Sequence, residues 1–337
     1  MNSNLLSKYR TELFGLSTVG ILIVHSNDVI QAGGGGTLDE LIRKLFAFGG
    51  VAVYVFVFLS GIGLYYSMSG KTGNNVLRFY QHRLSRLLMP YLLIAGSFYA
   101  AELLLLDWKP LEFFFRLSTL QFWFQKKGVW FVSMLIPLYI VYPFYYRWVE
   151  SGRRLAKTAV TVLVIAAVSY AQYICSPDVY NRLMQVWNSY IVFAVGHYMG
   201  EYVKERKMFP TALTAATLLF YSVRAFIPVL KEIAFFGNLG YGLMGIALSV
   251  IGAKCLDILH WEQGRRILRF LGKISLESYL TNHFLITLFV VYLGIKEAPL
   301  FSVKPYCAVE YLMIVILGLA GGYLCTKLEM TGKEHKE

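Results

Sequence analysis

The stretch RTELFGLSTVGILIVHSND, residues 10–28, is the most informative part of the chain. It begins with the charged residues Arg10 and Glu12, continues as an apolar run, and carries one ionisable side chain, His25, deep in the predicted helix. Hydrocarbon offers an imidazole no hydrogen-bond partner, so an unused histidine there costs free energy. An ionisable residue inside a membrane helix therefore indicates a functional site. The simpler interpretation is a packing histidine bonded to a neighbouring helix.

The composition around this stretch is that of a helical membrane protein. Of the 337 residues, 57% are hydrophobic and only 15% are charged, whereas a soluble domain carries about 25% charged residues. The apolar residues fall in blocks of about 20, the length that a helix needs to cross a bilayer. We predict an all-α, polytopic bundle in a single domain, 1–337. Its ten predicted membrane helices are 12–30, 49–68, 84–106, 129–149, 157–175, 187–203, 209–228, 233–258, 274–295 and 306–326.

The net charge of +12 does not indicate nucleic-acid binding, because the basic residues cluster in short segments between the apolar blocks. With both termini in the cytoplasm, 21 of the 32 Lys and Arg residues fall on the inner side, as the positive-inside rule requires. These residues also suit contacts with lipid headgroups. We expect no cleavable signal peptide. We predict a short amphipathic surface helix after GGGG (33–36) and an interfacial or re-entrant segment at 110–127.

Several polar groups could share a site with His25. Asp28 lies three residues further on, on the same helix face, and could orient the imidazole and raise its basicity. The stretch SLESYLTNH (275–283) is the most polar in any predicted span, and it places His283 at a depth close to that of His25. Its simpler interpretation is an interhelical hydrogen-bond network. His197 and Glu201, an i, i+4 pair, are the main rival site, although a solvated ion pair near the cytoplasm explains them more simply.

Two further motifs are open to a structural explanation. Arg83 and Arg86 lie one turn apart at the predicted cytoplasmic mouth of a helix, where guanidinium groups could bind phosphate or simply set the topology. Ser60 and Gly61 would let two helix backbones approach closely. The four cysteines have no spacing that indicates a metal site, and a disulfide between Cys175 and Cys307 is possible but not expected.

Five motifs in this order resemble those of the acyltransferase-3 family of integral membrane acyltransferases. That family includes bacterial O-acetyltransferases of O-antigen, capsule and peptidoglycan. The motifs are ILIVH (21–25), FVFLSGIGL (56–64), RFYQHRLSRLLMPY (78–91), VWFVSMLIPLYIVYP (129–143) and FLGKISLESYLTNHF (270–284). The resemblance extends over nearly the whole chain.

The resemblance implies transfer of an acetyl group from cytoplasmic acetyl-CoA to a hydroxyl of a carbohydrate. It makes His25 the essential histidine and places Arg83 and Arg86 against the acyl-CoA donor. The family also has an arginine upstream of the histidine, at the position that Phe14 occupies here. Arg10 lies one helical turn lower on roughly the same face and is its nearest counterpart.

We therefore expect a sugar O-acetyltransferase of the bacterial inner membrane, with His25 as general base or acyl carrier and Asp28 beside it. Acetyl-CoA is the expected donor and a polysaccharide or lipid-linked glycan the acceptor; no metal and no further cofactor is expected. The expected pocket residues are Ser60, Gly61, Trp130, Tyr279, Asn282 and His283. Aromatic residues near the outer face could stack on the sugar or form an interfacial belt (Trp108, Phe122, Trp123 and Trp130).

Two alternatives remain open from the sequence. The first is an exporter of polysaccharide or acyl groups without covalent chemistry of its own. Transporters often contain glycine-interrupted helices, and 233–258 carries Gly237, Gly240, Gly242 and Gly245. The second is a catalytically inactive scaffold. The oligomeric state does not follow from the sequence.

Overall fold

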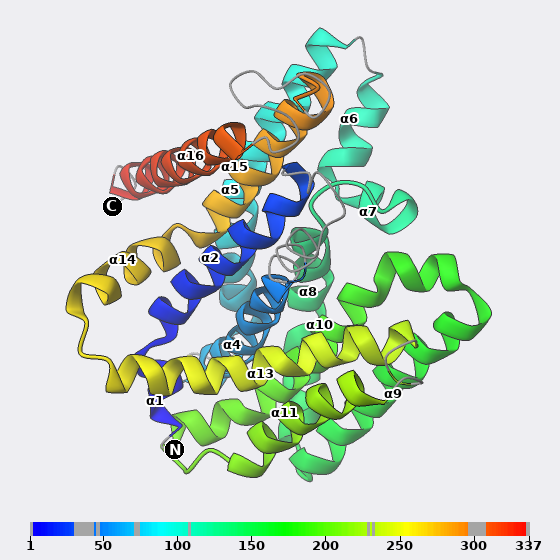
Figure 1. Cartoon of the computed structure of the whole chain (residues 1–337), viewed down its shortest axis with the longest axis vertical. Helices are drawn as coiled ribbons and strands as arrows, with labels where there is room; N and C mark the ends of the chain where they lie inside the picture. Colours follow the sequence, from blue (N-terminus) through cyan, green and yellow to red (C-terminus); the bar gives the residue numbers. More distant parts are fainter. Residues whose placement is uncertain are drawn as a thin grey trace. The chain divides into compact units, whose positions relative to one another are not determined.

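The structure, a computed structural model, describes residues 3–29, 44, 48–70, 75–106, 109–227, 230, 233–295 and 308–334 (Figure 1). All the elements in these ranges are helices. The predicted surface helix after residue 36 lies outside the described residues, as do Cys307 and Trp108. The chain forms two compact units, and α2 (Arg10–Val29), α5 (Val76–Leu105), α8 (Trp130–Glu150) and α14 (Glu262–Lys273) each contribute to both.

The first unit comprises residues 1–17, 51–81 and 137–269. Within it α10 packs against α4, α9 and α13, while α11 lies along α13 (Figure 1). Its complete helices are α1 (Asn4–Lys8), α4 (Val51–Met68), α9 (Arg154–Cys175), α10 (Pro177–Lys204), α11 (Thr211–Phe226) and α13 (Ala234–Ile258).

The second unit comprises residues 18–50, 82–136 and 270–337. Within it α15 and α16 lie side by side, and α15 continues into a π-helix, η1 (Figure 1). π-Helical turns are rare and often occur near functional sites. The complete elements of this unit are α6 (Pro110–Leu117), α7 (Leu120–Gln125), α15 (Ser275–Ile286), η1 (Thr287–Tyr292) and α16 (Ala308–Glu334).

Five described helices are long and apolar enough to cross a membrane, and the pair α14 and α15, bent by 68°, would make a sixth. The five are α4, α5, α9, the part of α13 from Phe235 on, and residues 309–329 of α16. The protein is therefore a multi-pass helical membrane protein. The count of ten spans and the cytoplasmic location of both termini remain predictions.

The predicted helices coincide with observed ones to within a few residues at most boundaries. However, α10 begins at Pro177 rather than at residue 187, and α16 ends at Glu334 rather than at residue 326. Most of the segment 259–272, predicted as a basic loop, forms α14, because its amphipathic pattern lacks the long apolar run that marks a span. α5 begins at Val76 rather than at residue 84, so the basic residues of the motif at 78–91 lie within the helix. The segment 110–127 forms two short helices, α6 and α7, separated by Thr119 at a φ of 66°.

Glycines allow a close contact between α4 and α10 in the first unit. A Cβ on Gly61 of α4 would lie 2.5 Å from the Phe193 carbonyl oxygen of α10. A Cβ on Gly196 of α10 would lie 2.3 Å from the Phe58 carbonyl oxygen of α4. Because small residues allow backbones to approach in a membrane, these two glycines explain the tight packing of α4 on α10.

Candidate functional site

His25 lies near the carboxyl end of α2, and its Nδ1 is 2.8 Å from Oδ1 of Asn282 on α15. The two residues belong to the same unit although 257 positions separate them. An amide oxygen can only accept a hydrogen bond, so in this arrangement Nδ1 carries the proton and donates it. The lone pair is then on Nε2, which is able to remove a proton or to attack a carbonyl carbon.

Asn282 is fully buried and is held by a face of small residues on α16. A Cβ on Gly318 would lie 3.2 Å from the Asn282 Cβ, and one on Gly322 would lie 2.4 Å from the Ser278 hydroxyl oxygen. Tyr311 of α16 donates a hydrogen bond to the Leu22 carbonyl, one turn before His25. α16 therefore positions both partners of the His25–Asn282 pair. The sequence signal for this role, the small-residue run around 318–322, was not among the predicted site motifs.

Aromatic rings line the neighbourhood of His25. The Tyr279 ring centroid lies 5.8 Å from that of His25 and 6.4 Å from that of His283. Phe131, at the start of α8, lies 5.9 Å from Tyr279. Trp130, a predicted pocket residue, is half-buried beside Phe131, which was not predicted. A phenylalanine in an apolar run carries no signal that separates a site residue from a packing residue.

The other predicted residues of the second unit are placed less fully. Asp28 lies on α2, but its side chain is outside the described residues, so its role stays a prediction. Arg83 is half-buried and Arg86 exposed, one turn apart near the start of α5. The two arginines have the spacing expected of a phosphate-binding pair, and that role stays a prediction.

Arg10 belongs to the first unit and packs into a niche on α4. A Cβ on Gly63 would lie 2.2 Å from an Nη atom of Arg10, so a side chain there would displace the guanidinium. The Arg10 guanidinium lies 5.2 Å from the Phe14 ring centroid, and Phe14 stacks on Phe56 at 4.9 Å. Phe14 thus supports Arg10 from the position at which the family has its arginine. Ser60 is half-buried on the same helix, and its pocket role stays a prediction.

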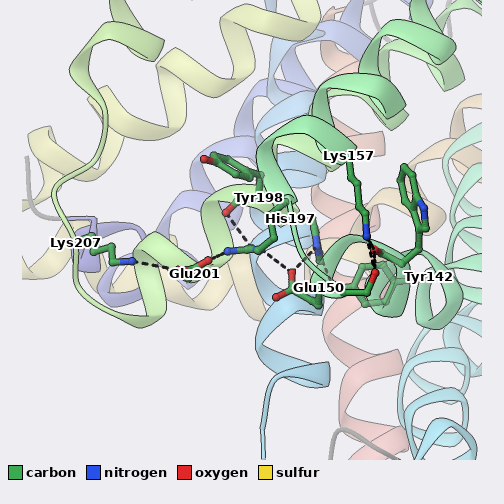
Figure 2. Close-up of polar contacts among 10 residues, drawn as sticks. Tyr142, Glu150, Lys157, His197, Tyr198, Glu201 and Lys207 are labelled. Carbon is green, nitrogen blue, oxygen red and sulfur yellow. Dashed lines mark hydrogen bonds and ion pairs between the residues drawn. The ribbon is translucent and has the colours of Figure 1, made fainter.

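The rival pair predicted at His197 and Glu201 belongs to a larger network in the first unit (Figure 2). His197 is fully buried, with Nδ1 3.0 Å from the Tyr142 hydroxyl and Nε2 3.4 Å from Oε1 of Glu150. Arg154 contacts Glu150 at 2.8 Å and also pairs with Glu201. The network therefore joins α8, α9 and α10 through compensating charges.

Burial raises the pKa of Glu150, but the contact with His197 and the charge of Arg154 outweigh burial, so the pKa lies below its ordinary value. Glu150 is consequently a carboxylate that balances Arg154. At the edge of the network, Lys207 contacts Glu201 at 3.1 Å with its side chain 49% exposed (Figure 2). This arrangement is that of a structural ion network.

Replacing Arg154 by leucine is expected to lower the free energy of unfolding by about 3 kcal/mol, because it leaves carboxylates in a largely buried place without their cation. The Arg154 side chain is only 16% exposed. The matched control is Lys207→Ala, which removes exposed ion pairs with Glu201 and Glu205 and should leave the Tm close to that of wild type. The check is the Tm of the purified variants in detergent. Equal Tm values for Arg154→Leu and wild type would contradict the structural role.

The fold and the His25–Asn282 pair define the protein as a polytopic membrane protein with a histidine site among its helices. The chain matches the family model Acyl_transf_3, described as an acyltransferase domain, over residues 15–327. The protein therefore belongs to the acyltransferase-3 family, which confirms the resemblance inferred from the motifs. No curated protein and no solved structure matches the chain.

Proposed function

We propose that the protein is a sugar O-acetyltransferase of the bacterial inner membrane. It would transfer acetyl from cytoplasmic acetyl-CoA to a hydroxyl of a cell-surface polysaccharide or its lipid-linked precursor. Membership of a membrane acyltransferase family supports the reaction class. The observation that carries the proposal is the 2.8 Å contact between His25 Nδ1 and Asn282 Oδ1, which places the ring proton on Nδ1 and the lone pair on Nε2.

In the proposed reaction His25 Nε2 removes the proton of the sugar hydroxyl as its oxygen attacks the thioester carbonyl. Collapse of the tetrahedral intermediate breaks the carbon–sulfur bond and expels the CoA thiolate. The thiolate then recovers a proton, and the imidazolium gives one up, so the reaction consumes no net proton. The alternative is that Nε2 attacks the thioester carbonyl and expels the CoA thiolate, forming an acetyl-imidazole. The sugar oxygen then attacks this acetyl group, the carbon–nitrogen bond breaks, and the hydroxyl proton goes to the thiolate. The geometry suits both routes.

The cationic residues are proposed to bind the donor phosphates. Guanidinium groups match phosphate oxygens in geometry and remain charged under all working conditions. Arg83 and Arg86 present two such groups on one turn of α5. For Arg10, Gly63 and Phe14 hold the guanidinium in place within the first unit, and its role in donor binding stays a prediction.

The acceptor side is proposed to use the aromatic and polar groups around His25. Sugars stack well on aromatic faces, and Tyr279 and Phe131 offer two rings close to the imidazole. His283 is proposed to line the same place, since its ring contacts that of Tyr279.

The exporter alternative has less support. The glycines of the predicted helix 233–258 suggested a broken helix, but α13 continues without a break from Ala234 to Ile258. Gly245 lies against Tyr54 of α4, where a Cβ would come within 2.5 Å, so this glycine serves close helix packing. A broken helix, which would line a transport pathway, is absent from the described part of α13.

The proposal is tested with purified protein in lipid nanodiscs, radiolabelled acetyl-CoA and a set of oligosaccharide acceptors. We expect label to move to an acceptor, or to remain on the protein when no acceptor is added. Chemical stability separates the products, because an acyl-imidazole hydrolyses far faster than a sugar ester. Absence of transfer with acetyl-CoA and with longer acyl-CoA donors, together with acceptor movement across the membrane, would support the exporter instead.

A further inference from the structure

Two glycines of α13 make room for one arginine of α11. A Cβ on Gly240 would lie 3.1 Å from Nε and 3.3 Å from Cδ of Arg224, and one on Gly237 would lie 3.3 Å from an Nη atom. The bare backbone at these positions lets the guanidinium lie directly on α13. These glycines therefore have a purpose different from that of Gly242 and Gly245, which face α10 and α4.

Two tyrosines hold the same guanidinium. Its carbon lies 4.9 Å from the Tyr221 ring centroid and 5.6 Å from that of Tyr241. The two rings are 6.0 Å apart and nearly perpendicular, at 73°. Cation–π contacts of this kind fix the orientation of a guanidinium but do not neutralise its charge.

Arg224 forms no ion pair with a carboxylate in the described part of the chain. Among the described residues no Asp or Glu lies within ion-pair distance of Arg224, and its Nε is buried without a hydrogen-bond partner. Other half-buried arginines differ: Arg116, Arg154 and Arg269 each pair with glutamates at 2.6–2.8 Å. A buried guanidinium nitrogen without a hydrogen-bond partner among membrane helices is costly and indicates a function.

We propose that Arg224, with Tyr221 and Tyr241, forms a binding site for a phosphate ester at the end of the α11–α13 pair. A guanidinium presents parallel N–H donors that suit two phosphate oxygens, and bound phosphate would supply the missing negative charge. The predicted topology places this end of the pair on the outer side. The phosphate could belong to a lipid headgroup reached by the long arginine side chain, or to a sugar phosphate. The inference does not depend on acyl transfer.

The test measures phosphate binding by the full chain in phosphatidylcholine nanodiscs, using the thermal shift of tryptophan fluorescence. One arm titrates glucose 1-phosphate, and the other replaces part of the lipid with phosphatidylglycerol. We expect a saturable rise in Tm in at least one arm. Arg224→Gln should weaken the apparent affinity at least tenfold. Gly240→Ala should weaken it to a smaller extent, because a Cβ 3.1 Å from Nε makes the guanidinium shift by a few tenths of an ångström.

Two matched controls accompany these variants. Gly242→Ala adds the same methyl group two residues away, where its nearest neighbour would lie 3.4 Å off, an ordinary contact. Arg266→Gln removes a positive charge from a side chain that is 77% exposed. Both should bind as wild type does.

The two arms identify the source of the phosphate. A response to phosphatidylglycerol alone assigns the site to a headgroup, and a response to glucose 1-phosphate assigns it to a sugar phosphate. Equal responses from wild type and Arg224→Gln, or no response in either arm, would overturn the proposal. Gly240→Ala keeps the charge of Arg224, so its weaker binding would rule out a general charge effect.

Discussion

His25→Ala is expected to reduce the rate of acetyl transfer by about 10²–10⁴-fold, the usual contribution of a general acid–base group. The reason is local, since Nε2 is the atom left with a lone pair once Nδ1 donates to Asn282. The measurement is the initial rate of label transfer from acetyl-CoA at saturating donor. Donor binding should change little, because the proposed phosphate contacts lie elsewhere. Full activity in His25→Ala would remove this histidine from the mechanism and favour His283.

Two substitutions of Asn282 test the same contact and should differ in activity. Asn282→Leu removes the acceptor for the Nδ1 proton while keeping similar volume, so kcat should fall and KM for acetyl-CoA should stay. Asn282→Asp keeps an oxygen acceptor and should recover part of the lost activity. If Asn282 served only the packing of α15 on α16, Asn282→Asp would not be more active than Asn282→Leu.

Gly61→Ala is expected to lower the free energy of unfolding by about 1–3 kcal/mol, the cost of overpacking a tight contact. The added Cβ would lie 2.5 Å from the Phe193 carbonyl oxygen and 2.8 Å from the His197 amide nitrogen. Both are backbone atoms of α10, which cannot turn away as a side chain can. The result should be a fall in Tm of several degrees for the protein in detergent.

The control for Gly61→Ala is Gly96→Ala on α5. There the new Cβ would lie 3.9 Å from the Leu117 side chain, so it adds no clash. Alanine also has a higher helix propensity than glycine, by about 1 kcal/mol, so this variant should be neutral or slightly stabilised. A Tm of Gly61→Ala equal to that of Gly96→Ala would show that α4 and α10 do not approach each other at Gly61.

The positions of the helices were predictable because a membrane helix is a local property. Its backbone hydrogen bonds lie within the segment, and its apolar length is visible in the sequence. The prediction 233–258 for α13 differs from the structure by one residue. α14 was missed because its polar and apolar residues alternate around the helix, which lowers the mean hydropathy that marks a span. The family was likewise evident from motifs.

The partners of these residues were decided by the tertiary structure. Asn282 was predicted as a pocket residue, but its contact with His25 Nδ1 depends on how α2 and α15 are rotated about their axes. The contacts of Arg10 with Gly63 and of Arg224 with Gly240 also depend on how the helices pack. A single sequence records which residues are small or charged. Which of them meet depends on side-chain packing among helices far apart in the chain, and no local pattern encodes that packing.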